Sequence, residues 1–229
     1  TFGKFLNAGQ VCISPDHLFV HSSVKDRFLT LLRARIARAY GTGATSPNLA
    51  QIVSDGHAAR LADVLADAVA KGAKPILNTG AKGRAMGPVL VEAITPEMRL
   101  DQEEIFGPIL PILPYDDLTQ VIDRINARDK PLALYIFDRD TARIDRIVGE
   151  TTSGGVGINL TMVQFSHANL PFGGVNTSGI GAGHGLTGFR GFSHERAVLR
   201  NRFLMLPLIF PPYGPRVMRL IGLIKRVLG

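Results

Sequence analysis

Apolar residues recur at helical spacing in two long stretches of the chain. Between Ser23 and Gly41 they occupy one side of a helical repeat, at Val24, Phe28, Leu31, Leu32, Ile36 and Ala39. This spacing indicates an amphipathic helix, for which Ser23 is a suitable N-cap and Gly41 a suitable stop. Residues 58–71 repeat the pattern and end at Gly72. The sequence therefore predicts helices over 24–40 and 58–71.

Short apolar segments separate these helices from further helical stretches. They predict strands at 17–21, 74–77, 89–93, 109–113, 132–137 and 154–158, with additional helices at 116–127 and 141–149. Strands that alternate with helices imply crossover connections and a mostly parallel sheet. We therefore predict an α/β fold, a mostly parallel sheet flanked by helices. Such sheets bind ligands at the carboxyl ends of their strands.

The pattern changes after residue 159. Residues 171–192 contain eight glycines, which favours a loop-rich region, and residues 194–206 could form a strand that leaves the domain. Residues 207–215 are rich in proline, and residues 216–228 have apolar positions at helical spacing among basic residues. We expect a catalytic domain at 1–192, an oligomerisation strand at 193–206, and a proline-rich segment with a basic amphipathic helix at 207–229.

Composition and charge narrow the class of protein. Apolar residues make up 45% of the 229, which is enough for a core, and the single cysteine excludes an internal disulfide. The net charge of +7 belongs to the end of the chain, because residues 196–229 hold seven basic residues and no acid. A basic groove across a nucleic-acid-binding fold would be distributed differently, so we expect no nucleic acid. We expect a cytoplasmic protein.

Cys12 is the first candidate for chemistry. Residues 1–7 are predicted to be the end of a helix that Gly9 terminates, and Cys12 follows this turn and precedes Ser14, Pro15 and a strand. A cysteine at such a turn faces a cleft, where backbone N–H groups stabilise a thiolate or a developing oxyanion. An inert core cysteine is the ordinary alternative for a lone thiol.

Three motifs point to one known family. The stretch Gly-Lys-Phe-Leu-Asn-Ala-Gly-Gln-Val-Cys at 3–12 resembles the cysteine motif of the aldehyde dehydrogenase superfamily. Gln-Glu-Glu-Ile-Phe-Gly-Pro at 102–108 resembles the cofactor-contact motif of this family. Leu-Pro-Phe-Gly-Gly-Val at 170–175 resembles a third motif of the family. The sequences at 130–135 and 153–156 are similar to those of one branch of the family, which contains class 3, fatty and coniferyl aldehyde dehydrogenases. The resemblance covers residues 1–203.

The resemblance implies a reaction and a role for each motif residue. Cys12 would attack an aldehyde, a hydride would pass to NAD or NADP, and the thioester left on Cys12 would be hydrolysed to the acid. Glu104 would accept hydrogen bonds from the nicotinamide ribose, and Phe106 would pack near the nicotinamide. Phe172 and Asn159 would line the aldehyde pocket. Taken alone, a Glu-Glu pair is usually solvated and a phenylalanine usually belongs to a core.

Two further patterns carry no site. Residues 183–188 fit the dinucleotide pattern G-x-G-x-x-G, but they follow no strand and no acidic residue lies about 20 positions later. The six histidines show no metal-ligand spacing, and His17 and His21 bracket a strand, so they would not share a helix face. We expect no metal.

The resemblance also implies that most of the cofactor-binding part, the water-activating glutamate and an oxyanion asparagine precede the cysteine motif. Because the chain begins at Thr1, we expect a fragment that is inactive alone. An acylating aldehyde dehydrogenase and a non-catalytic assembly domain remain as alternatives. We expect an aromatic or long-chain aldehyde as substrate and a homodimer through residues 193–206. Residues 216–228 could contact a membrane surface, or pack on the protein itself.

Overall fold

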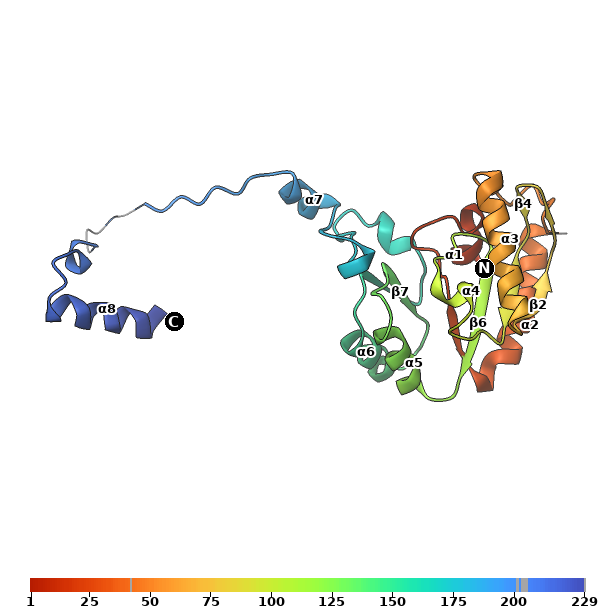
Figure 1. The fold of residues 1–229 in the computed structure, drawn as a ribbon, viewed down its shortest axis with the longest axis horizontal. Helices are drawn as coiled ribbons and strands as arrows, with labels where there is room; N and C mark the ends of the chain where they lie inside the picture. The colour runs from red at the N-terminus through yellow and green to blue at the C-terminus, as the bar shows by residue number, and fades with distance from the viewer. Residues whose placement is uncertain (42, 201, 203–205, 229) are drawn as a thin grey trace. The chain divides into compact units, whose positions relative to one another are not determined.

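The computed structural model describes residues 1–41, 43–200, 202 and 206–228. The chain divides into two compact units, Thr1–Phe192 and Ser193–Gly229. The first unit is the α/β fold that the sequence predicts (Figure 1). Its helices are α1 (Phe2–Phe5), α2 (Ser22–Tyr40), α3 (Asp55–Ala70), α4 (Arg99–Gln102), α5 (Leu118–Asn126), α6 (Thr141–Glu150) and α7 (Gly185–Gly191), and its strands are β1 (Leu18–His21), β2 (Lys74–Asn78), β3 (Ala81–Lys82), β4 (Ala85–Met86), β5 (Val89–Glu92), β6 (Ile109–Tyr115), β7 (Ala133–Ile136) and β8 (Gly155–Ile158).

The main sheet has four strands in the order β1-β6-β5-β2. Strand β6 pairs in parallel with both β1 and β5, whereas β2 adds an antiparallel edge to β5. Strands β7 and β8 form a second, parallel pair, and β3 and β4 form a short antiparallel hairpin. The prediction of a mostly parallel sheet is confirmed.

Side chains alternate between the two faces of the sheet, and each face is covered by its own helix. Val89, Val91 and Ile109 belong to the same buried cluster as the apolar face of α3. Leu90, Leu110 and Ile112 belong to the cluster that contains the apolar face of α2. Strands buried on both faces read as near-continuous apolar runs, which is the pattern at these positions.

The structure contains elements that the sequence pattern did not predict, among them α4 and the hairpin of β3 and β4. Residues 171–192 were expected to be a loop-rich region, and the structure adds a short helix there, α7 at Gly185–Gly191. Three of its seven residues are glycines, which disfavour a helix, so local propensity gave no sign of it. Residues 194–200 form no strand. The rest of the predicted oligomerisation strand includes 201 and 203–205, which lie outside the described residues, and its pairing with a second chain stays a prediction.

The second unit contains a short turn, η4 (Leu206–Ile209), and the helix α8 (Pro215–Leu228). The predicted helix at 216–228 is therefore confirmed. Within the described part of the chain, no helix is both long and apolar enough to cross a membrane.

A buried carboxylate ties three elements of the first unit together. Asp101 is 3% exposed. Its two carboxylate oxygens lie 2.6 Å from Arg124 and 2.6 Å from Arg128, and one lies 3.4 Å from the His17 ring. Burial alone would raise the pKa of Asp101, but His17 and the two arginines outweigh it and hold the pKa at about 2. The cluster joins α4 to α5 and to the start of β1.

We expect Asp101→Asn to lower the free energy of unfolding by about 2 to 3 kcal/mol at neutral pH, because it leaves two arginines facing a neutral buried group. The carboxyl has a pKa of about 2 in the fold against 3.8 in the unfolded chain. Its contribution is therefore present above pH 4 and lost as the pH falls from 4 to 2. Denaturant unfolding across this range should show the gap between wild type and variant closing. Asp63→Asn, at an exposed position of α3, is the control. A gap that stays constant down to pH 2 would contradict this account.

Candidate functional site

The loop that carries Cys12 has an unusual backbone. After α1, three consecutive residues adopt left-handed conformations, with φ of 51° at Asn7, 55° at Ala8 and 77° at Gly9. A turn follows, closed by a hydrogen bond of 2.8 Å from the Ser14 N–H to the carbonyl of Val11. Cys12 lies inside this turn and is exposed. The structure thus presents the thiol at a turn, where the sequence places it.

The side chain of Gln10 anchors this loop to a distant segment. Gln10 is buried, and its Oε1 accepts a hydrogen bond of 2.8 Å from the Val53 N–H. Its Nε2 donates to the carbonyls of Gln51, at 3.1 Å, and Asn7, at 2.9 Å. Asn7 in turn donates from Nδ2 to the carbonyl of Gln10 at 3.1 Å. Asn7 therefore braces the loop. The hydrogen bonds of Asn7 and Gln10 together hold the strained backbone conformation of residues 7–9.

The cysteine loop packs directly against the second motif. A β-carbon built on Gly9 would lie 2.3 Å from the carbonyl oxygen of Gly107, which no real side chain tolerates. Only glycine allows this approach at the observed φ of 77°. Two motifs almost a hundred positions apart in sequence are therefore in backbone contact.

The two glutamates of the second motif have different surroundings. Glu103 is ion-paired with Arg99, at 2.6 Å, and with Arg60, at 3.1 Å. No hydrogen bond to the Glu104 carboxylate is found within the described residues. Burial and the nearby charge of Asp16 raise the pKa of Glu104, while the cations Arg60 and Lys4 act in the opposite direction. Glu104 thus keeps both oxygens available to a ligand.

Phe106 is held with its backbone in the left-handed region, at φ 50°. Its carbonyl oxygen lies 2.8 Å from the Nε2 of His57, and the two rings meet edge to face at 6.1 Å. Arg60 donates to the carbonyls of Glu104 and Ile105. Contacts from α3 therefore set the conformation of the motif around Phe106.

A buried lysine lies beside both loops. Lys4 is 3% exposed, and its ammonium is 3.5 Å from the carboxylate of Asp16, which also accepts a hydrogen bond of 3.1 Å from the Ile105 N–H. Burial lowers the pKa of Lys4 to about 8, although Asp16 and Glu104 favour the charged form. Since the unfolded chain keeps this proton up to about pH 10.5, the fold gains stability as the pH rises from 8 to 10.5.

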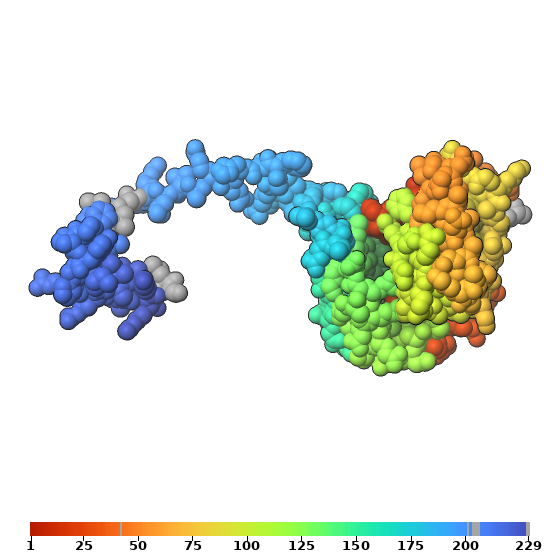
Figure 2. Space-filling view, viewed as in Figure 1, coloured from red at the N-terminus to blue at the C-terminus, as the bar shows by residue number. Residues whose placement is uncertain are grey.

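Ile13, the residue after Cys12, lines a cavity of about 210 Å³. Its lining is mainly apolar and comes from the cysteine loop, β7, β8 and the third motif, at Ile13, Leu132, Ala133, Gly154, Gly155, Val156, Gln164, Leu170, Pro171 and Phe172. Figure 2 also shows a hollow in this unit between the yellow-green segment and the green segment, but the residues that line the cavity belong to the red, green and cyan segments. The first and third motifs therefore meet at one cavity.

Residues that sequence reasoning missed help to build this cavity. The Tyr135 hydroxyl donates to the Ile13 carbonyl at 2.8 Å and accepts from Gln164 Nε2 at 3.2 Å. Burial raises the pKa of Tyr135, which keeps the phenol protonated as a donor. A tyrosine in an apolar strand carries no sign of a partner 122 positions away in the sequence.

Phe172 belongs to an aromatic cluster. Its ring stacks on His184 at 5.6 Å and meets Phe165 edge to face at 4.9 Å. The backbones of Phe172 and Gly183 exchange two hydrogen bonds, which bring His184 alongside. No sequence pattern pointed to His184, because it shows neither metal-ligand spacing nor helical periodicity. Only the fold of the glycine-rich segment brings its ring to Phe172.

Asn159 follows β8 directly, at the strand end where the sequence places it. Its Oδ1 accepts from the Asp138 N–H at 3.1 Å, and its Nδ2 donates to the Asp138 carbonyl at 2.9 Å. The amide thus clasps the chain after β7, and Asn159 is not among the residues that line the cavity. Its predicted role at the aldehyde pocket stays a prediction.

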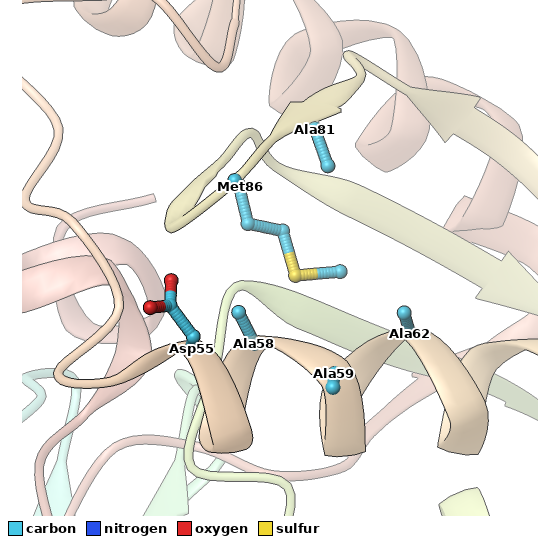
Figure 3. A pocket seen from close by; sticks show the side chains of 7 residues that line it. Asp55, Ala58, Ala59, Ala62, Ala81 and Met86 are labelled. Atoms are coloured by element: carbon cyan, nitrogen blue, oxygen red, sulfur yellow. The ribbon is translucent and has the colours of Figure 1, made fainter.

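A second cavity, of about 290 Å³, lies between α3 and the β3–β4 hairpin. Figure 3 shows alanines of α3 on one side and the side chain of Met86 extending toward them. It contains none of the predicted site residues. Among the residues that the structure describes, no three His, Cys, Asp or Glu side chains are grouped so that they could hold a metal ion.

Comparison with known proteins agrees with these motifs. The model of the aldehyde dehydrogenase family matches residues 1–198. The chain therefore belongs to the aldehyde dehydrogenase family.

Individual relatives place it near the predicted branch. The Caulobacter vibrioides protein named "Probable coniferyl aldehyde dehydrogenase" is 38% identical over 98% of this chain and 48% of its own length. Rat aldehyde dehydrogenase family 3 member A2 is 38% identical over 87% of this chain and 41% of its own. The substrate-bound Staphylococcus aureus AldH structure has a TM-score of 0.86 at 36% identity, covering 97% of this chain and 49% of that one. The chain spans about half the length of these relatives.

We expect Gly9→Ala to lower the free energy of unfolding by about 2 to 4 kcal/mol and to change the alkylation rate of Cys12, because it combines an unfavourable φ with a clash against Gly107. Gly80→Ala is the matched control, since Gly80 has φ 86° with nothing within 4 Å of the added carbon. Denaturant unfolding and intact-mass alkylation measure both effects. Equal destabilisation by the two variants would show that the contact between the motifs contributes nothing.

Proposed function

We propose that this chain supplies the nucleophile, part of the cofactor site and the aldehyde pocket of an enzyme that oxidises an aldehyde to a carboxylic acid with NAD or NADP. One observation carries the proposal. The loop of Cys12 touches the loop of Glu104 through Gly9 and Gly107, and it also borders the apolar cavity that Phe172 lines. Nucleophile, cofactor contact and substrate pocket thus adjoin.

Cys12 would act as the nucleophile. Its sulfur forms a bond to the aldehyde carbon, the carbonyl oxygen takes up the electron pair, and a thiohemiacetal results. Within the described residues the Cys12 N–H donates no hydrogen bond, so it is available to the developing oxyanion. Loss of hydride from the same carbon leaves a thioester on Cys12, and water then releases the acid.

Glu104 and Phe106 fit a nicotinamide cofactor. The Glu104 side chain is exposed and has two free acceptor oxygens, which suits the two hydroxyl donors of a ribose. Phe106 is fixed by His57, so its ring would offer a preformed apolar wall. When bound, NAD or NADP would supply the hydride acceptor.

The cavity beside Cys12 suits an aromatic or long-chain aldehyde. Its walls are mainly apolar, and Phe172, stacked on His184, gives one wall an aromatic face. Gln164 adds a buried Oε1 with no hydrogen-bond partner in the described part of the chain, which could accept a hydroxyl of the substrate. We place Asn159 at the edge of this pocket, as the family resemblance implies.

The family resemblance places the water-activating glutamate and a second oxyanion donor outside the residues assigned above. We therefore propose that the 229 residues alone form the adduct at Cys12 without completing the oxidation. We also propose that the protein works in the cytoplasm as a homodimer joined through residues 193–206.

Aldehydes should protect Cys12 from alkylation by iodoacetamide, because the thiohemiacetal removes the free thiol. We expect saturable protection by benzaldehyde and nonanal, measured by intact mass. Phe172→Ala should weaken protection by these two aldehydes about tenfold, through lost apolar contact, while protection by acetaldehyde changes little. Phe137→Ala, at an exposed position outside the cavity, is the control.

Absence of protection at any aldehyde concentration would contradict the assignment of Cys12. NADH formed by the isolated chain at a measurable rate would contradict the proposal that the chain cannot complete the oxidation.

A further inference from the structure

The unit Ser193–Gly229 has a charge distribution unlike the rest of the chain. From residue 196 onward the sequence has seven basic residues and no acid. Four of them, Arg216, Arg219, Lys225 and Arg226, lie on α8. An anionic partner would complement the charge of these side chains.

The same unit exposes a set of large apolar side chains. Val217, Leu220, Ile221 and Ile224 are half-buried along one face of α8, which contacts η4. Around them, six apolar or aromatic side chains remain more than half exposed, at Leu208, Phe210, Tyr213, Met218, Leu223 and Val227. The turn thus covers part of the apolar face and leaves the rest open.

An anionic lipid surface satisfies both features at once. The core of a protein interface is normally depleted of charged residues, whereas here arginines border the apolar side chains along the whole helix. A helix that lies in a bilayer interface has this combination, with apolar residues among the upper acyl chains and cations at the phosphates. Tyrosine and other amphipathic rings favour the same depth.

We propose that η4 and α8 bind the surface of an anionic phospholipid bilayer, with α8 parallel to the plane of the membrane. Leu223 and Val227 enter the apolar layer, and Arg219 and Arg226 contact lipid phosphates. The proposal is independent of the chemistry at Cys12 and brings the chain to membranes, where apolar aldehydes partition.

Vesicle flotation tests the charge requirement. The whole chain should bind vesicles made of equal parts phosphatidylcholine and phosphatidylglycerol. It should bind vesicles of pure phosphatidylcholine far more weakly. The double variant Arg219→Gln/Arg226→Gln should lower binding about thirtyfold at low salt. Arg27→Gln/Arg38→Gln removes the same charge from exposed positions of α2 and should leave binding unchanged. The proposal would be overturned if the chain bound neutral and anionic vesicles equally, or bound neither kind. It would also be overturned if the α8 and α2 double variants lost binding equally.

A tryptophan reporter tests the insertion of α8. The chain contains no tryptophan, so one introduced residue gives the only such signal. Leu223→Trp lies between Leu220 and Val227 on the helix surface and should shift its emission to the blue when anionic vesicles are added. Gly222→Trp lies between Arg219 and Arg226 and should shift little. Equal shifts at both positions, or a shift of Leu223→Trp without vesicles that grows with protein concentration, would overturn the proposal. The latter would mean that a second copy covers the helix.

Discussion

The candidate site depends on one close approach of two backbones. Gly9 meets the carbonyl of Gly107 at a distance that leaves no room for a β-carbon, and it does so at a positive φ. Since Gly9 lies three residues before Cys12, this contact fixes how far the thiol is from the motif of Glu104. Reaction of a thiol with an aldehyde beside a cofactor needs such preorganisation, because small misplacements of reacting atoms cost rate steeply.

Polar anchors keep the approach from relaxing. Gln10 ties the cysteine loop to the segment at Val53, and Asp16 ties it to the Ile105 N–H. Arg60 reaches the carbonyls of the Glu104 motif from α3. Two of the anchors belong to the cysteine loop and its flank and the third belongs to α3, and each satisfies a backbone group that would otherwise be unpaired. The two loops therefore behave as parts of one rigid site, with the sheet and α3 as the support.

Sequence patterns predicted the sheet, the two long helices and α8, because these elements have strong apolar periodicity. They did not predict the antiparallel edge β2, since an antiparallel strand has the same apolar pattern as a parallel one. Motif reasoning proposed Cys12, Glu104 and Phe172 as site residues, and their roles stay predictions. It missed Tyr135 and His184, whose placement depends on tertiary contacts that local pattern does not encode.

The contacts between the cysteine loop and the Glu104 motif should make them one cooperative unit in this chain. Native-state amide hydrogen exchange tests it most directly, using the N–H groups of Val53 and Ile105, which donate to Gln10 and Asp16, and the N–H of Ser14 inside the cysteine turn. We expect all three amides to open with the same free energy, because the loops must separate together. A Ser14 amide that exchanges like an unstructured peptide while Ile105 stays protected would contradict it.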